Sequence, residues 1–255
     1  MLSVLRVNFS KQLIEMRRYL PNTISEFITF YAIFLLLFLG IQAVGDPGTA
    51  DANIRYVIVS NAFWMLLVLS FMTMASEIAN EAIRGTLEQL YMSPVPAWQI
   101  VFVRAVSSIL IYLVLVILVV VAAMLTSGQW LSFSVPAALL LGIPTLASVL
   151  GLGFIGAGLA LVFKQIGSLL QIGQFFLMAM AFAPVGIFPG LELLPAMKGM
   201  DLVRNIAIGE LTLSQVTAAD WWTVLLNGAA WLAAGLLVFR LLEARALKRG
   251  VLGKY

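Results

Sequence analysis

Six long apolar runs divide this chain, and they strongly limit the folds that are open to it. Their approximate bounds are 24–44, 57–75, 101–125, 136–163, 166–188 and 221–242. Each has about the 20 residues that an α-helix needs to cross the hydrocarbon core of a bilayer. Only 11% of the residues are charged, against roughly a quarter in a typical soluble domain. The sequence therefore predicts an all-α membrane protein with six transmembrane helices in a single domain, 1–255.

The segment 1–22, before the first apolar run, is amphipathic. Its apolar residues recur at steps of three or four, the spacing of one helical face: Leu2, Leu5, Phe9, Leu13, Met16 and Leu20. Four basic residues lie off that face. A basic amphipathic helix next to a span is typical of a helix that lies in the membrane interface, and we expect one here.

The Lys and Arg residues are unevenly distributed between the two sides that six spans would define. Both termini would lie on one side, together with twelve of the fifteen basic residues. The other side would hold only Arg55, Lys198 and Arg204. By the positive-inside rule the twelve mark the cytoplasm. We expect a bacterial or archaeal cell-membrane protein with both termini in the cytoplasm.

The external connection 189–220, between the fifth and sixth runs, is rich in Leu, Met and Ile. Pro195, Gly199 and Gly209 interrupt it, so it is too broken to cross the membrane. We expect two short helices that dip into the outer leaflet and pack against protein as a re-entrant hairpin. A plain external loop is the alternative.

The cytoplasmic connection 77–97, between the second and third runs, carries most of the chain's informative polar residues. Its charged residues follow helical spacing, at i, i+4, i+7 and i+11: Glu77, Glu81, Arg84 and Glu88. This spacing allows ion pairs of Arg84 with Glu81 and with Glu88. We therefore expect the second span to continue as a helix into the cytoplasm.

Gly85 should interrupt that helix, because glycine is a poor helix former. The sequence Thr86-Leu87-Glu88-Gln89 has the pattern of a capping box, which predicts a second short helix across the membrane face. Ser93-Pro94-Val95-Pro96 should end it. A solvated loop with ordinary caps is the alternative interpretation of this segment.

The sequence Gly-Thr-Leu-Glu-Gln-Leu (85–90) followed by Pro-Val-Pro (94–96), between the second and third of six runs, resembles the membrane subunits of ABC type-2 exporters. The resemblance is closest to the branch that contains bacterial drug-resistance permeases. It extends over the whole chain, from the interfacial helix to the external hairpin. The segment 201–204 differs, because a proline-containing segment would be expected late in the hairpin.

The resemblance implies a permease that works as a homodimer or pseudo-dimer, bound to two copies of an ATP-binding cassette subunit and surrounded by membrane lipids. No nucleic-acid partner is expected. The chain lacks the G-x-x-x-x-G-K-[ST] loop of such ATPases. We therefore expect no catalytic, cofactor or metal site here, with ATP and Mg²⁺ bound by the partner.

In that family the short loop helix is the coupling helix, which sits in a cleft of the ATPase. The interfacial helix braces the same contact. Carried over to this chain, the resemblance implies an ATPase contact made by Glu81, Arg84, Gly85, Thr86, Leu87, Glu88, Gln89, Glu15, Arg17 and Arg18.

Polar side chains within the apolar runs are candidates for a translocation path, because burying them in a membrane is costly. In this family the path lies near spans one, two and five. The candidates, five of them on the fifth run, are Asn61, Ser168, Gln171, Gln174, Phe175 and Met178. Hydrogen bonding between helices is the alternative role for the amides and the hydroxyl.

The G-x-G-x-x-G pattern at 151–156 lies inside an apolar run with no strand before it, so it does not predict a nucleotide site. Gly153 and Gly156 each have an alanine four residues later. This small-xxx-small spacing predicts close packing of helices.

Three classes of function remain to be compared. An exporter permease would move an amphiphilic, drug-like or lipid-like cargo, because the candidate path is apolar with scattered amides; a lipid-linked glycan is the alternative cargo. A secondary carrier or channel is the second class, although no charged residue lies near the middle of a run. An intramembrane enzyme is the third, and it would have to work without His or Cys.

Overall fold

The computed structural model describes residues 2–46, 48–132, 134–163, 166–188 and 190–248. The described residues confirm the all-α class, since their regular elements are all helical. In chain order these are α1 (Leu2–Arg18), α2 (Leu20–Val44), α3 (Ala50–Ile83), α4 (Leu87–Tyr91), α5 (Ala97–Ser127), α6 (Val135–Phe163), α7 (Gly167–Phe182), α8 (Met197–Ile208) and α9 (Ala218–Lys248), with the 3₁₀ turns η1 (Val185–Ile187), η2 (Leu191–Leu193) and η3 (Leu213–Gln215).

Helix α3 is the central element of the bundle. It has 34 residues with neither glycine nor proline among them, and it is therefore about 51 Å long. It packs against α2, α5, α6, α7 and α8. The helix extends beyond the predicted span 57–75 at both ends, because Ile54 at its start and Ile78 and Ala82 near its end are also buried against neighbouring helices. The predicted helical extension beyond the span is thus confirmed.

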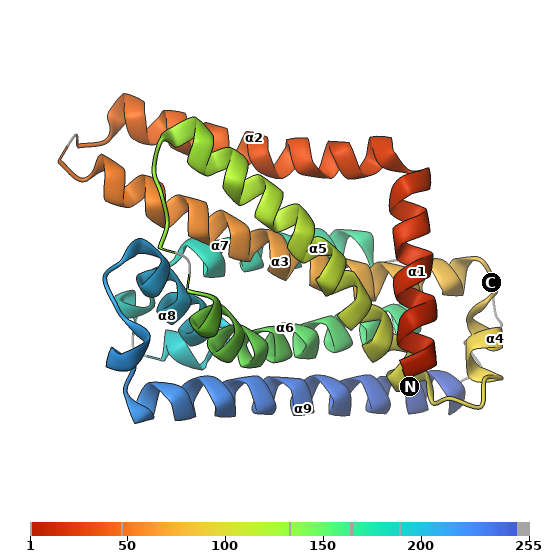
Figure 1. Cartoon of the computed structure of the whole chain (residues 1–255). Coiled ribbons are helices and arrows are strands. Elements are labelled where there is room, and N and C mark those ends of the chain that lie inside the picture. The colour runs from red at the N-terminus through yellow and green to blue at the C-terminus, as the bar shows by residue number, and fades with distance from the viewer. Residues whose placement is uncertain (1, 47, 133, 164–165, 189, 249–255) are drawn as a thin grey trace.

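Helices α2, α6 and α9 lie roughly along the same axis as α3, and α5 crosses them obliquely (Figure 1). Helix α1 lies across one end of this bundle, where α4 and the last turns of α9 are also found, and α8 lies at the opposite end. The side-chain amide Nε2 of Gln12 donates a hydrogen bond to Ser108 Oγ at 2.6 Å, which fastens α1 to α5. Pro21 lies in the first turn of α2, where the backbone N–H has no partner within the helix and proline is tolerated. The chain turns from α1 into α2 at Tyr19.

Five of the described helices are long and apolar enough to cross a membrane: α2, α3, α5, α6 and α9. In the predicted fifth span, 166–188, the α-helix α7 has only 16 residues, and the 3₁₀ turn η1 follows it. That length corresponds to about 24 Å, short of the roughly 30 Å hydrocarbon core. The helix ends because Pro184 disfavours helical geometry at the preceding Ala183, which is extended. The five long helices support an integral membrane protein, and α7 is too short to count as a sixth span by length alone.

The connection 190–217 contains one α-helix, α8, flanked by the 3₁₀ turns η2 and η3. The expected pair of short helices is therefore replaced by a single helix; Pro189 lies outside the described residues. Gly209, with a φ of +87°, ends α8. Met197, Met200 and Leu202 of α8 are buried, so the segment packs on protein, as expected.

Helix α6 packs against α3 and α9 through glycines, because the helices approach each other too closely there for a side chain. A Cβ atom on Gly151 would overlap the backbone carbonyl of Trp231 in α9, and one on Gly235 would overlap the carbonyl of Gly151. On the other side, Gly153 and Gly156 contact Met74 and neighbouring side chains of α3. The close packing predicted for Gly153 and Gly156 is confirmed.

Replacing Gly151 with alanine should destabilise the protein, because the added methyl group meets backbone that cannot move without separating α6 from α9. The expected cost is about 1–3 kcal/mol, as for other overpacked cores. It would be measured as a lower thermal transition of the purified chain in detergent.

Gly142→Ala is the matched control, since Gly142 lies in the same helix and has open space around its Cα. It should leave the transition unchanged or raise it slightly through helix propensity. Equal transitions for both variants would contradict the close α6–α9 contact.

Candidate functional site

The junction between α3 and α4 is built around a left-handed glycine. Gly85 has a φ of +71°, and it reverses the chain so that the Thr86 N–H bonds to the Glu81 carbonyl at 3.0 Å. The Gly85 N–H bonds to the Ala82 carbonyl at 3.4 Å. This pair of bonds is the usual glycine-dependent helix ending. The predicted break at Gly85 is confirmed.

The predicted capping box of α4 is wrong. The Thr86 hydroxyl donates to the Glu81 carbonyl at 3.4 Å, and no side chain caps α4. The reason is the reversal at Gly85, which directs Thr86 back to the end of α3. Thr86 therefore binds the end of α3, and its side chain does not cap the start of α4.

The charges near this junction pair differently from the prediction. Arg104 of α5 places Nη1 2.6 Å from Glu81 Oε1 and 4.0 Å from Glu77 Oε2. Arg84 and Glu88 are exposed, and among the described ion pairs Arg84 has none with Glu81 or Glu88. The helical spacing suggested those pairs, but it could not reveal the competing cation from α5. The result is an ion pair that joins α3 to α5 beside α4.

Helix α4 has a buried apolar side and an exposed polar side. Leu87 and Leu90 are buried in the same cluster as Met74 of α3. Glu88 and Gln89 are exposed, and they point away from the bundle. Burial beside an acidic residue of α9 raises the pKa of the Tyr91 hydroxyl, so Tyr91 stays neutral. Helix α4 is thus packed against the bundle by its apolar side and exposes polar side chains on the other side.

Arg17 and Arg18 of α1, which were predicted to take part in the ATPase contact, do not lie beside α4. Arg17 and Arg18 lie in the last turn of α1 and are exposed. That turn joins α2, on the side of the bundle away from α4 (Figure 1). The side chain of Glu15 lies outside the described residues. The two arginines and α4 share one end of the molecule without forming one patch.

The five candidate path residues on α7 lie along its outward side. Ser168 and Gln171 are exposed, and Phe175 is 72% exposed. Gln174 and Met178 are half-buried at the margin of the same surface. The structure therefore keeps this group together.

Asn61, the sixth path candidate, lies apart from the others. It is buried, and its Nδ2 donates to the Phe30 carbonyl of α2 at 3.3 Å. This is the interhelical hydrogen bond that was the alternative for such residues. Asn61 joins α3 to α2 within the chain.

An arginine at the opposite end of the bundle is buried, which was not predicted from the sequence. Arg204 of α8 is only 1% exposed. Its Nη1 donates to the Tyr56 hydroxyl of α3, its Nη2 donates to the Ala181 carbonyl at 3.0 Å, and its guanidinium lies 4.2 Å from the centre of the Tyr56 ring. Tyr56 in turn donates to the Phe182 carbonyl at 3.2 Å. Arg204 thereby joins α8 to α3 and to the end of α7.

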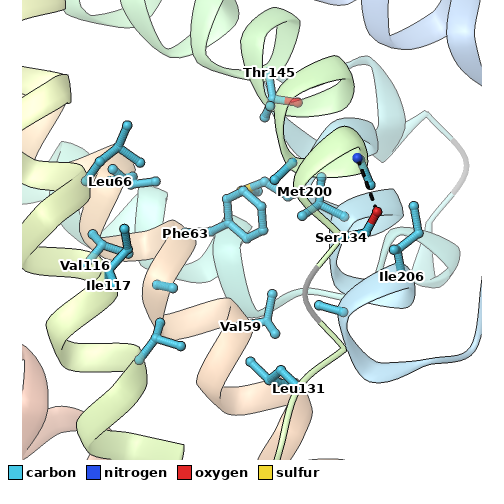
Figure 2. Close-up of a pocket in the computed structure, with 18 of the residues that line it drawn as sticks. Val59, Phe63, Leu66, Val116, Ile117, Leu131, Ser134, Thr145, Met200 and Ile206 are labelled. Carbon is cyan, nitrogen blue, oxygen red and sulfur yellow. Dashed lines mark hydrogen bonds between the residues drawn. The ribbon is translucent and has the colours of Figure 1, made fainter. Parts of the chain in front are cut away.

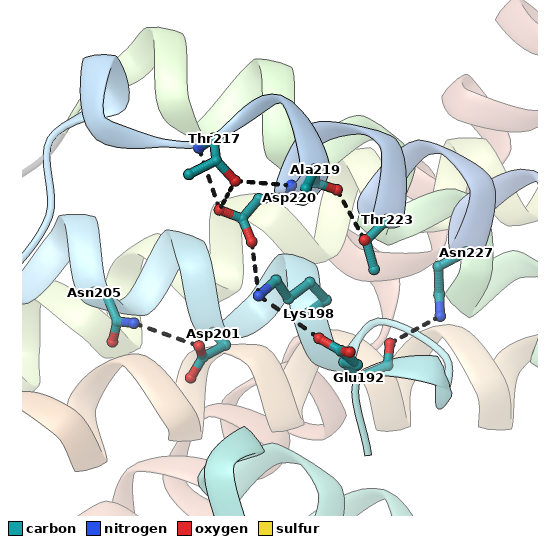
Figure 3. A network of polar contacts seen from close by, with 9 residues as sticks. All are labelled: Glu192, Lys198, Asp201, Asn205, Thr217, Ala219, Asp220, Thr223 and Asn227. Carbon is teal, nitrogen blue, oxygen red and sulfur yellow. Dashed lines mark hydrogen bonds and ion pairs between the residues drawn. The ribbon is translucent and has the colours of Figure 1, made fainter. Parts of the chain in front are cut away.

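A second polar group joins α8 and η2 to α9 (Figure 3). Lys198 Nζ lies 2.8 Å from Asp220 Oδ1 and 3.7 Å from Glu192 Oε2. Burial acts to lower the pKa of Lys198, but the hydrogen bond to Asp220 and the surrounding carboxylates raise it above its ordinary value. Asn227 of α9 donates to the carbonyl of Leu193 in η2 at 3.0 Å. Lys198 stays charged and holds the connection 190–217 against α9.

An apolar cavity of about 470 Å³ lies between α3, α5, α6 and α8 (Figure 2). Phe63 of α3, Ile117 of α5, Thr145 of α6 and Met200 of α8 represent its four walls. The cavity could not be predicted from the sequence, because each of these residues is also typical of ordinary packing within a span or core. The cavity arises from how the helices diverge, which is a property of the fold alone.

Comparison with protein families places most of this chain in one of them. Residues 40–242 match the family described as ABC-2 family transporter protein. The chain belongs to the ABC-2 transporter family. The predicted resemblance to ABC type-2 permeases is thus confirmed, and membership makes the chain a membrane component of an ABC transporter and implies an ATP-binding partner. A search of curated proteins found no match.

Replacing Tyr56 with phenylalanine should destabilise this ABC-2 protein, because the guanidinium of the buried Arg204 loses a hydrogen-bond acceptor. Hydrogen bonds to charged groups are worth about 1.5–3 kcal/mol, and we expect a loss in that range. Thermal unfolding of the purified variant in detergent would measure it.

The control is Tyr31→Phe, which removes an exposed hydrogen bond to Thr126 Oγ1 and should cost no more than about 0.5 kcal/mol. An effect of Tyr56→Phe as small as that of Tyr31→Phe would show that the Arg204 contact contributes little.

Proposed function

We propose that the chain is the permease subunit of an ATP-driven exporter that moves an amphiphilic, drug-like or lipid-like cargo out of the cytoplasm. A separate subunit would bind and hydrolyse ATP with Mg²⁺, and two such subunits would act on two copies of this chain. The observation that carries the proposal is α4, a short helix with a buried apolar base and exposed polar side chains at one end of a membrane bundle.

The anchoring of α4 suits a part that receives force from outside the membrane. Leu87 and Leu90 fix it to the core, and the reversal at Gly85 ties it to the end of α3. The Glu81–Arg104 ion pair joins α3 to α5 directly beside it. A push on α4 would therefore reach two long helices together. We infer that α4 is the coupling helix of the transporter.

The distribution of charge supports a cytoplasmic position for the α4 end. Arg55, Lys198 and Arg204 are the basic residues placed at the other end, near the start of α3 and on α8. Most of the remaining basic residues belong to α1, the α4 region and the end of α9. By the positive-inside rule, the α4 end and both termini face the cytoplasm.

Helix α7 would supply the sixth crossing despite its length. Leu170, near its start, packs in the same cluster as Leu87 of α4. Met180, near its end, packs in the same cluster as Met197 of α8. The helix therefore runs from the α4 end toward the α8 end, and the turns after Phe182 lie among α8 contacts. This direction supports the six-span topology.

The outward side of α7 would form the contact with the second copy and the path between copies. Ile172, Phe175 and Phe176 are 67%, 72% and 52% exposed there, together with Ser168 and Gln171. A contiguous apolar surface of this kind is covered in a membrane either by lipid or by protein. We propose that a second copy covers it, with the amides facing the cargo between the two copies.

The combined substitution Arg84→Ala and Glu88→Ala should weaken binding of the ATPase, because both side chains are exposed, Arg84 at the end of α3 and Glu88 on α4, within the proposed contact. If each contributes at least about 1 kcal/mol, recovery of the two-plus-two complex should fall about tenfold or more. The measurement is co-purification in mild detergent with the ATP-binding cassette partner of this chain.

Asp51→Ala combined with Glu210→Ala is the control, since both residues are exposed toward the α8 end and should not affect recovery. Normal assembly of the α4 double variant would contradict the coupling-helix assignment. Transport in vesicles that responds to an ion gradient and not to ATP would instead support the carrier or channel hypothesis.

A single cysteine at position 175 should crosslink two copies of the chain in membranes, because Phe175 lies at the centre of the proposed dimer contact. The chain has no cysteine of its own, so Phe175→Cys gives a clean reporter for bis-maleimide or oxidative crosslinking, scored by gel mobility. Leu226→Cys on α9, 62% exposed in the protomer, should remain monomeric. The reverse pattern would move the dimer contact to α9.

A further inference from the structure

The cavity between α3, α5, α6 and α8 is apolar on nearly all sides, and its polar groups are already satisfied or gathered at one edge. Thr145 Oγ1 donates to the Leu141 carbonyl at 2.6 Å, so it offers little to a polar ligand. Ser132 and Ser134 lie together on the connection between α5 and α6. An apolar cavity of this kind excludes water and accepts apolar molecules. Its natural occupant is therefore a hydrocarbon.

The cavity is open at the side of the molecule that faces away from the bundle axis. Ile117 and Val121 of α5 belong to its wall, and they are nevertheless 56% and 46% exposed. The surfaces on both sides of this opening continue as exposed apolar residues, such as Val114 on α5 and Ile143 on α6. Because α5 and α6 are both long and apolar enough to span a membrane, this surface would be covered by lipid. The cavity thus connects directly with the bilayer interior.

The inner wall of the cavity is deep. Met200 of α8 is fully buried and Leu67 of α3 is only 1% exposed, yet both line the cavity. Figure 2 shows Phe63 between Val116 and Ile117, on the α5 side of the cavity, and Met200. Space of this size left empty would forfeit many packing contacts. A long, thin and flexible occupant fits this geometry better than a compact one.

We propose that this cavity binds one acyl chain of a bilayer phospholipid, with the polar end of the lipid near Ser132 and Ser134 at the α8 end. The acyl chain fills the space that α5 and α6 leave over α3, and it packs against the inner side of α8. The site lies inside one protomer, apart from the outward side of α7, and its occupation requires neither cargo nor an ATPase.

The test uses the full chain reconstituted in vesicles that contain a phosphatidylcholine with a photoreactive diazirine near the end of one acyl chain. After illumination, adducts are mapped by peptide mass spectrometry. We expect adducts on buried wall residues such as Met200, in addition to outward residues such as Leu36 and Leu226. Adducts confined to outward residues would overturn the proposal.

Gly142→Phe supplies the decisive variant, because Gly142 lines the cavity and has open space at its Cα. Its ring should occupy part of the cavity and lower the Met200 adducts about tenfold, which corresponds to a loss of about 1.4 kcal/mol in binding free energy. Gly40→Phe on α2 is the matched control, since Gly40 also has open space and does not line the cavity; it should leave the adducts unchanged. Undiminished Met200 adducts in folded Gly142→Phe would overturn the proposal.

If Gly142→Phe does not give a monodisperse protein, the smaller substitution Ala138→Leu fills the same region and carries the same expectation. Because vesicles with this chain alone contain no ATPase and no cargo, the outcome is independent of the export proposal. A lipid adduct at Met200 with failed ATPase assembly would separate the two conclusions.

Discussion

The close backbone contact of α6 with α9, and the glycine contacts of α6 with α3, determine the rest of the arrangement. Helices in lipid gain little from burying apolar side chains against one another, so they associate where small residues allow close approach. Gly151 and Gly235 provide that approach on the α9 side, and Gly153 and Gly156 provide it on the α3 side. Three long helices are thereby fixed as one unit, and the other elements attach to it.

Polar contacts are found mainly at the two ends of this unit. The ion pair of Arg104 with Glu81 lies beside α4, and the contacts of Arg204 and Lys198 hold α8 at the other end. Charged groups are expensive within a bilayer unless they are paired. Their placement leaves the middle of the bundle to apolar side chains and gives each end its own defined geometry. The two ends can therefore be specified separately by sequence while sharing the same central helices.

The sequence predicted features that depend on local physics. Apolar length indicated the spans, the low helix propensity of glycine marked the break at Gly85, and small-residue spacing indicated the close packing of Gly153 and Gly156. Each of these signals can be recognised within a single segment of the sequence. The family resemblance added the identity of α4 as a candidate contact.

Features that depend on distant partners could not be obtained in the same way. Arg84 has suitable carboxylates one turn away, yet Glu81 pairs with Arg104, 23 positions along the chain. Arg204 meets Tyr56, which is 148 positions away. Apolar length overestimated α7, because Pro184 interrupts a run whose hydrophobicity continues. The cavity exists only because α5 and α6 diverge over α3, which no single segment encodes.

The uninterrupted α3 has a mechanical consequence. Its 34 residues contain no glycine or proline at which the helix could bend easily, so it behaves as a rigid lever. A tilt of about 5° about one end would displace the other by roughly 4 Å, given its length of about 51 Å. One end carries the turn into α4, and the other carries Tyr56 with Arg204 and α8. A small rotation at the proposed ATPase contact would therefore become a side-chain-sized displacement at the far face, without any intermediate joint.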